Sequence, residues 1–125
     1  MKKSLFCLLI TIVVSASVHA QLANTKWKGI LALDNPVNVT FNFGKDTLSV
    51  YNIDENHVLE TMTFTADKTT FTLLKVSGQS DCPTSTAGKY KYQIKDDKLL
   101  MMVVDDACND RAPYLNNLQL VRDLH

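Results

Sequence analysis

The segment Val37-Asn38-Val39-Thr40-Phe41-Asn42-Phe43 alternates apolar and polar side chains without interruption. A period of two directs successive side chains to opposite faces of an extended strand, and β-branched and aromatic residues favour that conformation. Turn-forming residues stand on both sides, with Asp34-Asn35-Pro36 before the segment and Gly44-Lys45-Asp46 after it. The segment therefore predicts a half-buried β-strand over residues 37–43, bounded by tight turns.

The same alternation recurs along the chain, and no window sustains the helical spacing of i, i+3, i+4 and i+7. Because most of the expected connections are only a few residues long, consecutive strands should pair as antiparallel hairpins. Short strands at regular spacing predict an all-β fold, an eight-stranded antiparallel up-and-down barrel. The expected strands cover residues 25–33, 37–43, 47–53, 58–65, 69–76, 87–95, 98–104 and 117–122.

The first twenty residues differ in composition from the rest of the chain. A positive start at Lys2 is followed by an apolar run over residues 5–14 and by small residues ending at Ala20. These features predict a secretory signal peptide over residues 1–20, cleaved after Ala20, and one barrel domain over residues 21–125. The apolar run is shorter than the roughly 20 residues of a membrane span, which disfavours the alternative of a retained anchor helix. We expect a secreted or periplasmic protein.

The overall charge excludes several classes of partner. The 125 residues contain 13 basic and 13 acidic side chains and are 46% hydrophobic, which is typical of one globular domain. No block of like charge is present for nucleic acid or an anionic membrane surface to bind. We therefore expect no nucleic-acid partner and no membrane-spanning segment in the mature domain.

Two of the three cysteines, Cys82 and Cys108, remain after removal of the signal peptide. An exported protein folds in an oxidising compartment, so these two favour a single disulfide over two free buried thiols. In an up-and-down barrel, alternate connections share one end. Cys82 follows the fifth expected strand and Cys108 follows the seventh, so both should lie at the same end of the barrel.

Trp27 lies near the start of the first expected strand and Arg122 lies on the last. The C-terminal half contains Cys-Pro, Gly-x-Tyr-x-Tyr and Asp-x-Cys-x-x-Arg motifs, at residues 82–83, 88–92 and 106–111. Together these features resemble the lipocalin-like (calycin) barrels, and in particular small secreted bacterial proteins of largely unassigned function. The resemblance implies a lipocalin-like barrel in which Trp27 closes one end and Arg122 packs across it in a cation–π contact.

Groups suited to catalysis or metal binding are few. Asp105, Asp106 and Asp110 could form a calcium site, but they lack EF-hand spacing. We favour a structural role, in which Asp105 or Asp106 pairs with Arg111 and accepts hydrogen bonds from loop amides. No serine lies in a Gly-x-Ser-x-Gly elbow, histidines are too few for a zinc site, and no phosphate-binding glycine pattern occurs. We therefore expect no enzyme activity, no metal and no cofactor.

The leading functional hypothesis is a binding module for a small apolar ligand. The alternative is a protein-interaction or inhibitor module that uses the long connections 77–86 and 105–116 as a rigid surface. A hydrolase or isomerase on the same barrel ranks last. An internal cavity of about 300 Å³ or more would favour the ligand hypothesis, and an exposed apolar patch at the disulfide would favour the interaction hypothesis. The residues expected to line such a cavity are Phe41, Met62, Phe64, Tyr90, Tyr92 and Met101.

Overall fold

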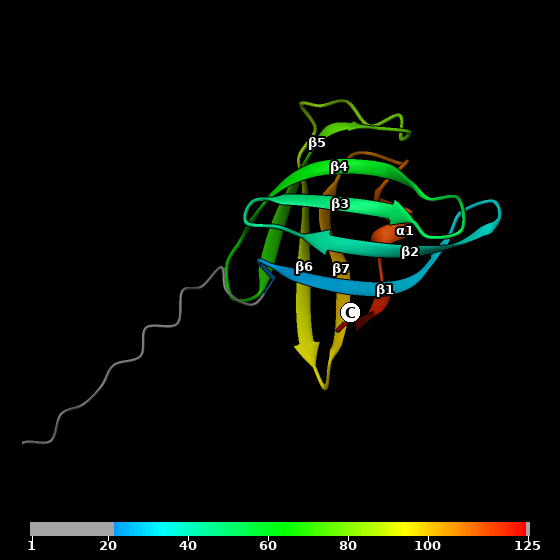
Figure 1. Ribbon diagram of the computed structural model, residues 1–125. Coiled ribbons are helices and arrows are strands. Elements are labelled where there is room, and N and C mark those ends of the chain that lie inside the picture. The colour runs from blue at the N-terminus through cyan, green and yellow to red at the C-terminus, as the bar shows by residue number, and fades with distance from the viewer. Residues whose placement is uncertain (1–21, 125) are drawn as a thin grey trace, which may run out of the picture.

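The computed structural model describes residues 22–124, so the predicted signal peptide and its cleavage site lie outside the described residues. Eight antiparallel strands pair in chain order and close into a barrel where β1 meets β8 (Figure 1). This confirms the predicted all-β, up-and-down architecture. The elements are β1 (Thr25–Ala32), β2 (Pro36–Phe43), β3 (Thr47–Asn52), β4 (His57–Ala66), β5 (Thr70–Gly78), β6 (Gly88–Lys95), β7 (Lys98–Asp106), α1 (Ala112–Leu115) and β8 (Leu118–Arg122).

One element was not expected from the sequence. The connection between β7 and β8 contains the single-turn helix α1, with a proline in its first turn, where a missing backbone N–H costs nothing. Its Leu115 is buried against the core. Within residues 22–124, no helix has the length and apolar character that crossing a bilayer would require.

Aromatic side chains fill one part of the barrel interior. Phe43 makes edge contacts with Phe64 and Phe71, at centroid distances of 5.2 and 6.4 Å, and Phe71 stacks on Tyr90 at 5.5 Å. Such contacts add to the free energy that the buried area itself contributes. The inward orientation predicted from the alternation is confirmed, because all six of the residues chosen are buried. These residues are Phe41, Met62, Phe64, Tyr90, Tyr92 and Met101.

Trp27 and Arg122 close one end of the barrel. The indole is fully buried, and the guanidinium carbon of Arg122 lies 4.5 Å from the ring centroid, which confirms the predicted cation–π contact. Arg122 also donates from Nε to Oδ1 of Asp97 at 3.0 Å, and the indole Nε1 donates to Oγ1 of Thr25 at 2.8 Å. Gly29 lies beside this contact, and a Cβ there would collide with Leu120.

The opposite end carries the predicted disulfide. Cys82 and Cys108 are bonded, with their Cα atoms 5.5 Å apart. The bond ties the β5–β6 connection to the β7–β8 connection, so both cysteines lie at one end, as the up-and-down arrangement requires. We call this the disulfide end. It is formed by the connections that follow β1, β3, β5 and β7.

Candidate functional site

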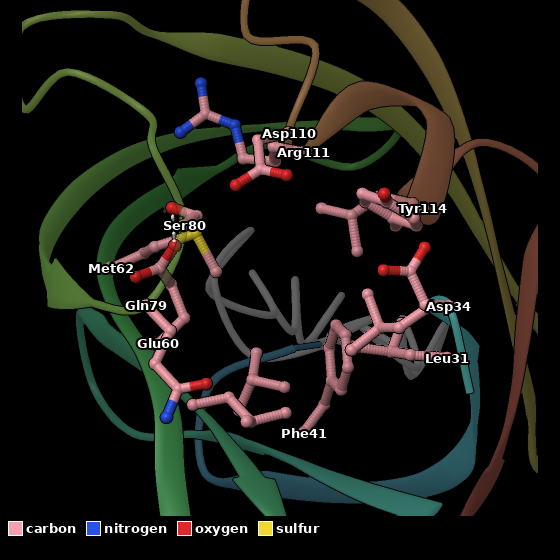
Figure 2. Close-up of a pocket in the computed structure, with 14 residues that line it drawn as sticks. Leu31, Asp34, Phe41, Glu60, Met62, Gln79, Ser80, Asp110, Arg111 and Tyr114 are labelled. Atoms are coloured by element: carbon pink, nitrogen blue, oxygen red, sulfur yellow. Dashed lines mark hydrogen bonds between the residues drawn. The ribbon is translucent and has the colours of Figure 1, made fainter. Parts of the chain in front are cut away.

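A pocket of about 300 Å³ opens at the disulfide end (Figure 2). In Figure 2, Glu60, Met62 and Ser80 lie on one side of it and Tyr114 and Leu31 on the other. The apolar lining residues are Leu31, Leu33, Phe41, Val50, Leu59, Met62 and Leu115. The polar lining residues are Asp34, Glu60, Gln79, Ser80, Asp110, Arg111 and Tyr114.

Helix α1 covers one side of this pocket. Pairing between β7 and β8 involves only Lys98–Met101 of β7. Beyond Met101, α1 and not β8 lies beside β7 on this side. The side chain of Asn116 accepts a hydrogen bond from the backbone N–H of Val103 at 3.1 Å, which joins the end of α1 to β7. Tyr114 and Leu115 of α1 therefore face the pocket where β8 does not reach.

A buried ion pair anchors the start of α1. The Arg111 side chain is 4% exposed, and it donates to Asp106 from Nε at 2.6 Å and from Nη2 at 2.9 Å. Nη2 also donates to the carbonyl oxygen of Thr86 at 2.9 Å. The carboxylate of Asp106 further accepts the Tyr90 hydroxyl and the backbone N–H of Cys108. The predicted pairing of an aspartate with Arg111 is thus confirmed, with Asp106 as the partner.

This network shifts three pKa values. Burial alone would raise the pKa of Asp106, but the hydrogen bonds from Arg111, Tyr90 and Cys108 outweigh it and hold that pKa below 3.8. Burial is the larger cause that raises the pKa of Tyr90, and the hydrogen bond to the negatively charged Asp106 raises it further. Burial by itself would lower the pKa of Arg111, because it disfavours the charged form. The hydrogen bonds and the negative charge of Asp106 have the larger effect, so the Arg111 pKa is raised. The ion pair therefore stays charged at neutral pH.

Glu60 forms the polar side of the pocket opposite α1. Its Oε2 accepts a hydrogen bond from the Ser80 hydroxyl, and its Oε1 lies 3.8 Å from Nζ of Lys75. Gly78 makes room for this carboxylate, because a Cβ there would collide with it. Gly78 also has a φ of +137°, a conformation that side-chain-bearing residues rarely adopt.

The structure divides the six predicted lining residues into two groups. Phe41 and Met62 line the pocket. The other four are buried but do not line it, and they are Phe64, Tyr90, Tyr92 and Met101. The polar residues Glu60, Ser80, Arg111 and Tyr114 were not predicted as site residues. A signal for one of them was present, because Glu60 shares the alternation of Met62 and Phe64, which places a charged side chain on the inward face.

The pocket combines an apolar wall with a small number of polar side chains. In the part of the chain that is described, no group of three or more His, Cys, Asp or Glu side chains could hold a metal ion. Asp106, part of the candidate calcium cluster, is engaged by Arg111 instead. Comparisons with protein-family models, curated proteins and solved structures found no match for this chain.

Proposed function

We propose that the protein is a secreted or periplasmic, lipocalin-like binding module that holds a small, largely apolar molecule in the disulfide-end pocket. The observation that carries the proposal is the cavity of about 300 Å³. This volume lies at the lower limit of ordinary ligand pockets, which combine a mainly apolar lining with a few polar groups. The disulfide supports export, because such bonds persist in oxidising compartments.

The two ends of the barrel differ in a way that supports this proposal. The end closed by Trp27 and Arg122 is packed, and the aromatic core fills the interior beside it. The pocket lies at the other end and is bounded by Phe41, Val50 and Met62. A small barrel with one packed end and one open end suits a compact ligand. The Trp27–Arg122 contact also supports a lipocalin-like assignment.

The interaction hypothesis has less support from the surface. Within the described residues, neither of the loops joined by the disulfide, 79–87 and 107–111, contains an exposed large apolar side chain. These loops instead contribute Gln79, Ser80 and Arg111 to the lining of the pocket. Exposed apolar anchors are typical of docking surfaces. Those near this end lie outside the two loops, on Ile53, Val58, Val76 and Val104. The pocket, and not the pair of loops, therefore carries the proposal.

An uncharged fluorescent dye such as N-phenylnaphthylamine, which brightens in an apolar site, tests the proposal directly. Val50 is buried in the pocket wall, so Val50→Trp should fill the cavity and weaken dye binding at least about tenfold. Val58→Trp is the matched control, because Val58 is 48% exposed and does not line the pocket. It should leave dye binding unchanged.

Thermal unfolding of both variants separates loss of binding from loss of fold. The proposal predicts that Val50→Trp loses most of the dye fluorescence although thermal unfolding shows that the variant is still folded. If the wild-type protein gives no dye signal, or if folded Val50→Trp binds the dye as the wild type does, the pocket is not the binding site. Native mass spectrometry of the protein from its own host would then identify the retained molecule as added mass.

A further inference from the structure

The lining of the pocket carries more negative than positive charge. Its charged side chains are those of Asp34, Glu60, Asp110 and Arg111. Glu60 is paired with Lys75, whose Nζ lies 3.8 Å from Oε1. Arg111 is paired with Asp106, with 2.6 Å between Nε and Oδ2. Each of these ion pairs cancels its own charge, so the carboxylates of Asp34 and Asp110 are left uncompensated.

Both of the uncompensated carboxylates lie at the mouth of the pocket. Asp34 belongs to the connection between β1 and β2 and is exposed, and Asp110 belongs to the connection between β7 and β8 and is half-buried. Asp110 accepts a hydrogen bond from the backbone N–H of Asp81 at 2.7 Å. Among the described residues, neither carboxylate forms an ion pair with a lysine or arginine side chain. A positive charge at the mouth would therefore meet carboxylates that the protein does not neutralise.

An aromatic ring accompanies these carboxylates. Tyr114 projects from α1, is half-buried and lines the pocket. In the view of Figure 2 its side chain stands between those of Asp34 and Asp110 along the border of the pocket. The face of an aromatic ring attracts cations, and so do carboxylates. Together these are the kinds of group that recognise an ammonium group.

The apolar wall and the mouth suit different parts of one molecule. Phe41, Val50 and Met62 are buried in the wall, where a charged group would lose its hydration at a large cost in free energy. At the mouth, a charged group keeps its contact with water. There the two aspartates would repel a carboxylate and attract an ammonium group, and an uncharged group would gain nothing from their charge.

We infer that the ligand is a cationic amphiphile, with an apolar body in the cavity and an ammonium group at the mouth, beside Asp34, Asp110 and Tyr114. The ammonium group need not touch both carboxylates, because at physiological ionic strength charges act on one another over about 8 Å. This inference rests on the proposed function and narrows it to one chemical class of ligand.

Three probes with eight carbon atoms each test the inference on the unaltered protein. Octylammonium, octanol and octanoate are each titrated against bound N-phenylnaphthylamine near neutral pH. An exposed ion pair changes binding by a factor of about two to five. Because the two aspartates attract octylammonium and repel octanoate, octylammonium should displace the dye at a concentration about tenfold lower than octanoate. Octanol should lie between them.

The salt dependence distinguishes this attraction from a difference in shape between the probes. Raising the NaCl concentration from about 20 mM to about 500 mM shortens the screening length from roughly 20 Å to about 4 Å. The displacement concentrations of octylammonium and octanoate should then lie within about threefold of each other, whereas that of octanol should stay nearly constant. A preference for octylammonium that salt does not reduce would contradict its electrostatic origin.

Asp34→Asn and Asp110→Asn locate the effect on the two side chains. Each removes one negative charge, and asparagine at position 110 keeps an oxygen that can accept the Asp81 N–H. Either variant alone should reduce the preference for octylammonium over octanoate to about threefold, and the two together should abolish it. Asp46→Asn is the matched control, because Asp46 is exposed in the connection between β2 and β3, at the opposite end of the barrel. The same change of charge there should leave the preference unchanged.

The outcomes separate this inference from the proposed function. If the dye binds but octanoate displaces it as well as octylammonium does, or if no probe displaces it, the inference is overturned and the pocket stands. The inference is also overturned if folded Asp34→Asn with Asp110→Asn keeps the wild-type preference. A protein that binds neither the dye nor any probe contradicts the proposed function as well. The order of the probes is measured on the wild type, so the inference stays testable even if Asp110→Asn does not fold.

Discussion

Asp106→Asn should destabilise the protein strongly, because it removes the counter-charge of a buried cation. The Arg111 side chain is 4% exposed and that of Asp106 is fully buried, with 2.6 Å between Nε and Oδ2. Removing one partner from a buried ion pair costs about 3–5 kcal/mol, chiefly because the other charge stays buried without compensation. Asparagine keeps one oxygen acceptor for the loop, so we expect a loss near the lower value, about 3 kcal/mol. For a domain of this size, that lowers Tm by roughly 10–20 °C.

Urea denaturation followed by the fluorescence of Trp27 measures this loss, provided that the m-value is unchanged. Asp105→Asn is the matched control. Asp105 is exposed and adjacent, so the same change of charge there should alter the stability by less than about 0.5 kcal/mol. A loss below about 1 kcal/mol for Asp106→Asn would refute the view that this pair anchors α1 and its side of the pocket.

The stability lost in Asp106→Asn should also depend on pH. Because the pKa of Asp106 in the folded protein is lowered from its ordinary value of 3.8, its charge contributes stability that is fully present only well above pH 3.8. That contribution disappears as the pH falls through the folded pKa. The difference in stability between wild type and Asp106→Asn should therefore be constant from neutral pH down to about pH 5, and should shrink under more acidic conditions. A difference that grows on acidification would contradict the assigned sign.

Two further predictions concern the two ends of the barrel. Replacing both cysteines by serine (Cys82→Ser with Cys108→Ser) should cost about 3.5 kcal/mol, from the chain entropy of a bond spanning 26 residues. Circular dichroism should then show a lower Tm with the strand spectrum retained, whereas a wild type unaffected by reduction would mean that the bond contributes nothing. Arg122→Ala removes a cation 4.5 Å from the Trp27 ring, a contact worth about 0.5–2 kcal/mol, and should shift the fluorescence of Trp27. An unchanged emission spectrum would show that Arg122 does not shield the indole.

Local pattern was sufficient to place the strands. Alternation within a segment such as Val37–Phe43 depends only on which side chains follow one another, so β2 was predicted to within one residue. The end of β5 was harder to place, because its last residues, up to Gly78, pair with β4 across an irregular register that no local pattern reveals. Helix α1 was missed for a similar reason. Four residues are too few for a helical period, and α1 is held by contacts with β7 and the core.

The site was predictable only in part. Phe41 and Met62 line the pocket, but Phe64 and Tyr90, which share the same inward alternation, lie in the aromatic core. Alternation selects the face of a strand and not the depth along the barrel axis. Depth depends on how the strands are staggered around the closed sheet, and this stagger is a property of all eight pairings together.

The sequence by itself determined the strand order and the shared end of the two cysteines, which follow from the period of two and from short connections. The contact of Arg122 with Trp27 was expected only from the resemblance to lipocalin-like barrels. Only the tertiary structure decided that a cavity remains at the disulfide end and that Glu60 and Arg111 both line it. Whether space is left inside a barrel depends on how side chains from distant segments pack together, and no stretch of neighbouring residues determines that packing.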